Sequence, residues 1–120
     1  MRGNATRGHR VSFGEFGLQA TEPGLVTGRQ IEACRVTISR AIGNSGKYWI
    51  RIFPHKPFSA IPLETRMGTG KGEPEYWAAI IRPGTVMFEV GGIPQAVARR
   101  ALNKAASKIP IHCRLALRQK

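Results

Sequence analysis

Aspartate is absent from this chain of 120 residues, and acidic side chains are scarce. The seven acids are all glutamates and stand against nineteen lysines and arginines, which gives a formal net charge of +12 at pH 7. Such an excess must lie mainly on the surface, where like charges repel one another unless an anionic partner neutralises them. The composition therefore favours DNA, RNA or an acidic membrane as a partner.

Cysteines and long apolar runs are also scarce. Cys34 and Cys113 are the only cysteines, and no histidine stands at metal-ligand spacing from either. A structural zinc site needs about four ligands, so we expect two free, at least half-buried thiols and no metal. No apolar run reaches the roughly eighteen residues of a membrane-spanning helix. Residues 1–8 lack the apolar core of a signal peptide, so we expect a soluble, intracellular protein.

Catalytic constellations are equally hard to find. No serine lies in a nucleophile elbow. His112 and Cys113 are adjacent on an expected strand and would point to opposite faces, which suits no catalytic dyad. Glu73 and Glu75 flank Pro74 as a conceivable acid–base pair, but balancing the neighbouring cations is the simpler role for them. We therefore expect no enzyme activity and no cofactor.

A basic, glycine-rich loop is the most informative stretch that the chain does contain. Residues 66–77 read RMGTGKGEPEYW, and the three alternating glycines exclude an ordinary helix or strand. Its free backbone N–H groups and the cationic side chains of Arg66 and Lys71 suit an anionic partner. The loop lacks the Walker spacing and precedes a strand rather than a helix, which disfavours a mononucleotide. A nucleic-acid backbone is the favoured partner, a merely solvated hairpin loop is the main alternative, and a mononucleotide is the least favoured of the three.

Length and a hydrophobic content of 42% predict one domain with a genuine core. Residues 1–10 carry Arg2, Arg7 and Arg10 without apolar periodicity. They indicate either a basic arm that orders on a polyanion or an ordinary frayed terminus, and we favour the arm. Residues 11–120 would then form the single domain, beginning with a strand over 11–20 that has room for a bulge at a glycine.

Two amphipathic helices are predicted. Thr27 and Gln30 form a capping box that starts a helix ending near Gly43. Arg29 and Arg40 lie on its outer face, where they either contact phosphate or remain solvated. A second helix has Pro94 in its first turn and ends before Pro110. The expected buried stripes are Ile31, Cys34, Ile38 and Ile42 in the first helix and Val97, Ala98, Ala101, Leu102 and Ala105 in the second.

The other periodic segments predict strands. Residues 47–53 alternate, with Lys47, Trp49 and Arg51 on one face, where the tryptophan either stacks on bases or packs internally. Three prolines then predict an extended loop around Lys56. Pro83-Gly84 predicts a hairpin between strands 76–82 and 85–90. A last strand, 111–118, would turn Arg114 and Arg118 outward and Ile111, Cys113, Leu115 and Leu117 inward. The expected fold is α+β, a mostly antiparallel sheet with both helices on one face.

Four segments, at residues 29–33, 49–57, 64–77 and 87–92, carry a resemblance. They read RQIEA, WIRIFPHKP, ETRMGTGKGEPEYW and MFEVGG. In sequence, order and spacing they resemble bacterial-type ribosomal protein L-sixteen of the large ribosomal subunit, over about Arg2 to Leu115. The long central motif is far more specific than a lone glycine pattern.

This resemblance implies an α/β-hammerhead-like domain that binds large-subunit rRNA near the peptidyl-transferase region and helps to position tRNA. Other large-subunit ribosomal proteins would be neighbours, and a membrane would not. The ribosome would be that of a bacterial cytoplasm or of an organelle. The expected rRNA-binding residues are Arg2, Arg7, Arg10, Arg29, Arg40, Lys47, Arg51 and Lys56. The expected tRNA-proximal loop consists of Arg66, Met67, Gly68, Gly70, Lys71 and Gly72.

Two departures from the family pattern matter. Relatives usually begin with a further stretch rich in Lys and Arg before the segment that matches Met1 to Gly3. The missing stretch indicates either a shortened gene product or a mispredicted start. A shortened product would lose part of that RNA anchoring, so a free ribosome-assembly or regulatory RNA-binding factor is the alternative function. The segment from Arg114 to Lys120 also differs from its usual counterpart.

Overall fold

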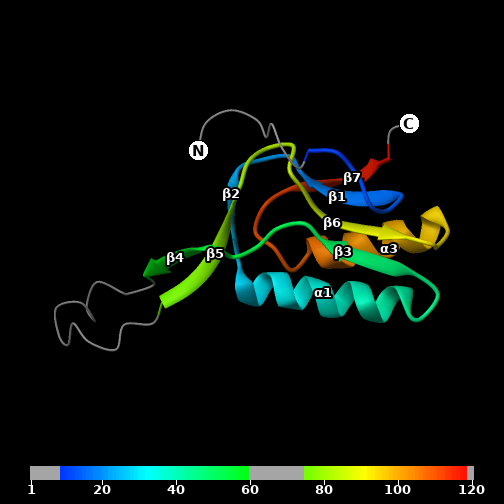
Figure 1. Ribbon diagram of the computed structural model, residues 1–120, viewed down its shortest axis with the longest axis horizontal. Helices are drawn as coiled ribbons and strands as arrows, with labels where there is room; N and C mark the ends of the chain where they lie inside the picture. Colours follow the sequence, from blue (N-terminus) through cyan, green and yellow to red (C-terminus); the bar gives the residue numbers. More distant parts are fainter. Residues whose placement is uncertain (1–8, 60–74, 119–120) are drawn as a thin grey trace.

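Two antiparallel sheets and two helices form the part of the chain that the computed structural model describes, residues 9–59 and 75–118 (Figure 1). The first sheet has the spatial order β3 (Lys47–Ile50), β6 (Val86–Gly91), β1 (Phe16–Ala20), β7 (Cys113–Leu117). The second has the order β2 (Gly24–Thr27), β5 (Glu75–Ile81), β4 (Lys56–Ser59). The helices are α1 (Gly28–Ile42) and α3 (Gln95–Ala106). The predicted α+β class is confirmed, and its strands divide between two sheets.

The four-stranded sheet has one apolar and one polar face. Leu18 in β1 is paired with Phe88 in β6 and with Leu115 in β7, and all three belong to or pack against the core. One residue along, Glu89 is paired with Gly17 and Trp49. Because successive residues of a strand point to opposite faces, these lie on the face away from the core. The polar face is therefore built around a glutamate.

Both helices cover the apolar face, as predicted. Thr27 Oγ1 accepts a hydrogen bond from Gln30 N and Gln30 Oε1 accepts one from Thr27 N, so the capping box at the start of α1 is confirmed. The buried residues of α1 are the four of the predicted stripe, Ile31, Cys34, Ile38 and Ile42. In α3 the small side chains of Ala98, Ala101 and Ala105 are buried and let α1 approach closely. The Cys34 thiol donates to the Ala105 carbonyl at 3.3 Å across this contact.

The hairpin predicted at Pro83-Gly84 was wrong in its pairing. The turn is present, with Thr85 N donating to the Arg82 carbonyl and Gly84 at a φ of +97°. However, β5 lies between β2 and β4, and β6 lies between β1 and β3. Both edges of each strand are occupied, so the turn leads from one sheet to the other.

Three further strand details differ from expectation. β2 was not predicted, and β4 lies where an extended loop was expected. Pro57 is tolerated in β4 because that strand is at the edge of its sheet. Leu117, expected to face inward, is 55% exposed at the end of the edge strand β7. Figure 1 shows that β4 and β5 project from the body as a ribbon, with β5 continuing into the body beside β2.

Candidate nucleic-acid interface

A buried carboxylate holds the N-terminal segment on the polar face of the four-stranded sheet. The Glu89 side chain is fully buried and accepts hydrogen bonds from the backbone N–H groups of Ser12 at 3.1 Å and of Phe13 and Gly14 at 2.7 Å. The Arg51 guanidinium also donates to it. We call this arrangement of Ser12, Phe13 and Gly14 on Glu89 the N-terminal clasp. It fixes where the chain leaves the sheet toward its N-terminus.

The clasp keeps Glu89 ionised. Burial by itself would raise the pKa of this carboxyl, but the hydrogen bonds from Gly14, Ser12, Arg51 and Phe13 together outweigh it and hold the pKa below the ordinary 4.5. A carboxylate that accepts several backbone N–H bonds is stabilised in its charged form even without water. The negative charge at the centre of this face is thus satisfied within the protein.

Aromatic packing accompanies the clasp. The rings of Phe13 and Trp49 stack with centroids 6.4 Å apart and planes 24° from parallel. The Arg51 guanidinium carbon lies 5.1 Å from the Phe13 ring centroid, within range of a cation–π contact. A Cβ on Gly14 would lie only 2.4 Å from the Val90 carbonyl oxygen, so this close approach requires glycine. Of the two alternatives for Trp49, the structure favours internal packing.

The other glutamates with described side chains are also engaged internally. Glu32 pairs with Arg35 on α1, and the hydrogen bond from Arg35 is the main cause of a lowered Glu32 pKa. Glu15 accepts from Gly92 N, and Glu22 accepts from His112 N. Leaving Lys56 aside, the cations of residues 9–59 and 75–118 form two ion pairs, Arg35 with Glu32 and Arg51 with Glu89. Most described cations therefore face solvent without a carboxylate partner.

One group of cations lies between the two helices. Arg40 of α1 and Lys104 of α3 border a shallow groove together with Lys108, which follows α3. Thr37, Ala41 and Ser107 complete its lining, and we call it the helix groove. Arg40 and Lys104 lie in the last turns of their helices, where the helix dipole favours positive charge. The three cations in one depression suit the phosphates of a nucleic acid, whereas the hydroxyls of Thr37 and Ser107 already donate to backbone carbonyls.

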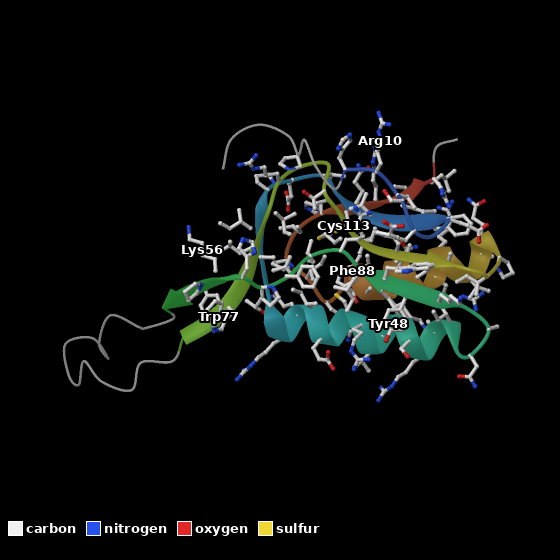
Figure 2. All side chains as sticks on the ribbon, viewed as in Figure 1. Arg10, Tyr48, Lys56, Trp77, Phe88 and Cys113 are labelled. Carbon is white, nitrogen blue, oxygen red and sulfur yellow. The ribbon has the colours of Figure 1, made fainter. Side chains whose placement is uncertain are left out.

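A second group lies beside β7 on the polar face of the four-stranded sheet. Two overlapping depressions share His9, Gln19 and Arg114 in their linings, and Arg10 and Arg118 border the first of them. We call this region the sheet-face hollow. Figure 2 shows that Arg10 points away from the body of the protein on this side. Arg114 in β7 and Arg118 just after it are both exposed, as predicted from the alternation.

The projecting ribbon carries a third group. Lys56 of β4 and Trp77 of β5 are exposed, and both are labelled on the ribbon in Figure 2. Phe53, just before β4, is 69% exposed. A Cβ on Gly28 would lie 3.6 Å from Pro54 Cγ and 3.7 Å from the Trp77 carbonyl oxygen, so the start of α1 lies against the base of the ribbon. Exposed aromatic rings near cations can stack on unpaired bases.

A known protein family matches almost the whole chain. The model for ribosomal protein L16p/L10e matches residues 1–116 of the 120. The chain belongs to the ribosomal protein L16p/L10e family. The predicted resemblance is thereby confirmed, and with it a structural, non-enzymatic role in the large ribosomal subunit.

The predicted rRNA-binding residues of this L16p/L10e chain do not form one patch. Arg40 joins the helix groove, Arg10 borders the sheet-face hollow, and Lys56 lies on the ribbon. Arg29 is exposed at the start of α1, and Lys47 is exposed at the start of β3. Arg51 has a different setting, since its side chain is 17% exposed and bonds to Glu89 and to the Arg10 carbonyl. The predictions that fall outside the described residues are Arg2, Arg7, Arg66, Met67, Gly68, Gly70, Lys71 and Gly72.

Sequence reasoning did not find the residues that organise this L16p/L10e surface. Glu89 is the one acid in the otherwise apolar strand β6, and that contrast is the signal that could have identified it as a buried, paired group. Nothing in the sequence places Lys104 and Lys108 beside Arg40. Among the described residues, no helix is long and apolar enough to cross a membrane, and no three metal-ligating side chains gather.

Proposed function

We propose that the protein binds large-subunit rRNA near the peptidyl-transferase region and helps to position tRNA during translation. The observation that carries this proposal is the surface charge of an L16p/L10e family member. Exposed cations gather in the helix groove, the sheet-face hollow and the ribbon, while the described glutamates are engaged internally. An rRNA surface that touches several sides of the protein would neutralise all three groups.

The contacts of the body are expected to position the protein and not to read sequence. Lysine and arginine side chains on phosphates fix register and orientation without distinguishing bases. Folded RNA offers phosphates and sugar hydroxyls in a defined three-dimensional arrangement, so cations on separate faces can recognise its shape. The separation of Arg40, Arg10 and Lys56 on different elements fits a protein that fills a space between RNA segments.

The glycine-rich loop is the part that we assign to tRNA. β4 and β5 flank residues 60–74 in the sequence and form the projecting ribbon, so the loop starts and ends at that ribbon. Its cations, Arg66 and Lys71, would then act at a distance from the body. On this proposal the body binds rRNA and the loop meets a different RNA.

The test uses two double variants that each remove two cations. Arg66→Ala with Lys71→Ala changes the loop, and Arg99→Ala with Arg100→Ala changes the exposed side of α3. Each protein is incorporated into large subunits that lack the endogenous copy, and both retention on the subunit and tRNA binding are measured. The loop variant should remain on the subunit and bind tRNA more weakly, while the α3 variant should leave tRNA binding unchanged. An equal loss of both properties in the loop variant would contradict the division of roles.

A further inference from the structure

An arginine on the sheet-face hollow is held in place by a buried amide. Arg114 in β7 lies directly opposite Gln19 in β1, and its Nε donates to Gln19 Oε1 at 2.9 Å. Gln19 is 9% exposed, and its Nε2 donates to the carbonyls of Gly84 at 2.8 Å and His9 at 3.1 Å. Both ends of the amide are thus satisfied. The side chain of Gln19 therefore holds the Arg114 guanidinium at its Nε atom.

This arrangement leaves the outer edge of the guanidinium available. Among the described residues neither Nη atom of Arg114 makes a hydrogen bond or an ion pair. Arginine presents its donors in a planar fork that matches two oxygens of a phosphate at once. Because Gln19 already holds the Nε atom, the guanidinium loses less conformational freedom when its two Nη atoms bind a ligand. Arg114 is therefore preorganised as an anion donor.

The surroundings of Arg114 are basic and partly closed. Arg10 and Arg118 border the same depression, and the His9 backbone is tied to Gln19. The segment that carries Arg10 is fixed by the clasp, because Arg51 donates to the Arg10 carbonyl at 3.0 Å while it also bonds Glu89. Glu22, the acid nearest in sequence to Gln19, already accepts a hydrogen bond from the His112 backbone N–H. No described carboxylate lines the hollow.

We propose that the sheet-face hollow binds a backbone phosphate of RNA, with Arg114 as the fork that meets its oxygens, Gln19 as the positioning residue, and Arg10 as a second cation. This inference rests on the proposed function for the nature of its partner and adds Arg114 and Gln19, which were not among the expected rRNA-binding residues. It also assigns a role to the C-terminal strand β7.

The experiment compares two single variants that lose one positive charge. Arg114→Gln removes the proposed fork. Arg35→Gln removes an arginine whose guanidinium is already bonded to Glu32 and Tyr48, so it serves as the matched control. Affinity for protein-free large-subunit rRNA is measured at a series of salt concentrations. Circular dichroism and urea unfolding establish that each variant is folded.

Loss of one phosphate contact should reduce the slope of log affinity against log salt by about 0.7 to 0.9. Between 50 and 200 mM salt the wild type should accordingly lose about threefold more affinity than Arg114→Gln does. Arg35→Gln should keep the wild-type slope. Arg114→Lys keeps the charge without the fork and should bind rRNA with the wild-type slope but lower affinity. A slope for Arg114→Gln equal to that of Arg35→Gln would overturn the inference.

Inorganic phosphate separates RNA from a small anion as the source of the phosphate group. The NMR signal of the Arg114 Nε–H should shift when rRNA fragments are added and should stay in place with inorganic phosphate at the same ionic strength. A shift with inorganic phosphate alone would overturn the assignment to RNA. If the wild type binds no rRNA, the proposed function fails as well, whereas strong wild-type binding with an unaltered Arg114→Gln slope refutes only this site.

Discussion

Replacing Glu89 by glutamine should unfold the protein at much lower denaturant concentrations. The substitution keeps the size of the side chain but exchanges one accepting oxygen for an amide that donates. In the clasp, the carboxylate faces only donors, namely three backbone N–H groups and the Arg51 guanidinium. At least one of these donors must then lose its partner, and Arg51 loses its counter-charge while only 17% exposed.

The magnitude follows from burial. Removing one partner of a buried ion pair typically costs about 3–5 kcal/mol, because the remaining charge stays desolvated. Arg51 retains the Arg10 carbonyl as a partner, so we expect the lower end, about 3 kcal/mol, against a total stability of about 5–15 kcal/mol for a domain. With a urea m-value of about 1–3 kcal/mol per M, the midpoint should fall by roughly 1–3 M.

The assay is urea unfolding followed by circular dichroism, and the matched control is Glu32→Gln. Glu32 is also paired with an arginine, but its side chain is 60% exposed in an i,i+3 helix pair. Water replaces such a contact readily, so the control should leave the midpoint close to that of the wild type. Equal urea midpoints for Glu89→Gln and the wild type would refute the claim that the clasp stabilises the folded protein.

Four more outcomes follow from the described contacts. The pKa of Glu89 is lower in the folded protein than its ordinary value of 4.5, so the ionised side chain stabilises the fold at neutral pH. This stabilisation is lost as the pH falls below about 4.5 and through the pKa of the folded state. The difference in unfolding free energy between the wild type and Glu89→Gln should therefore close in acid. Thr27→Ala should cost about 1 kcal/mol in urea unfolding through loss of the capping box, and a midpoint unchanged within error would contradict that assignment. Alkylation of the native protein should modify Cys113 before Cys34. Burial raises the pKa of Cys113 to about 11 and that of Cys34 to about 12, and Cys34 is also fully buried. Mass spectrometry that shows the reverse order would contradict the packing of α1 on α3. Lys104→Glu should release the protein from rRNA at lower salt than Lys104→Gln, and identical salt dependence would remove the helix groove from the interface.

The local chemistry of the fold could be read from the sequence, and the pairing of distant strands could not. The capping box of Thr27 and Gln30 and the buried stripe of α1 depend on residues within a few positions, and the structure confirms both. The turn at Pro83-Gly84 was also correct as a local feature. Its use as a link between sheets depends on which strands occupy the edges of β5 and β6, and that competition is settled only by the whole fold.

The candidate interface shows the same limit. Exposure of Arg40, Lys104 and Arg114 follows from helical and strand periodicity. Their grouping depends on α3 packing across α1 and on β7 pairing with β1, contacts between segments far apart in the sequence. Arg51 illustrates the converse case, because its position on the outward face of a strand was predicted, whereas its bond to Glu89 requires β3 and β6 to be neighbours in register.

Sedimentation of native lysate through a sucrose gradient, followed by a salt wash of the subunit fractions, tests the central claim most directly. The account predicts that the protein migrates with the large ribosomal subunit, withstands moderate salt and is released only at high salt, as expected for many phosphate contacts. Protein that stays at the top of the gradient would contradict a structural role on the subunit and would favour a free assembly or regulatory factor.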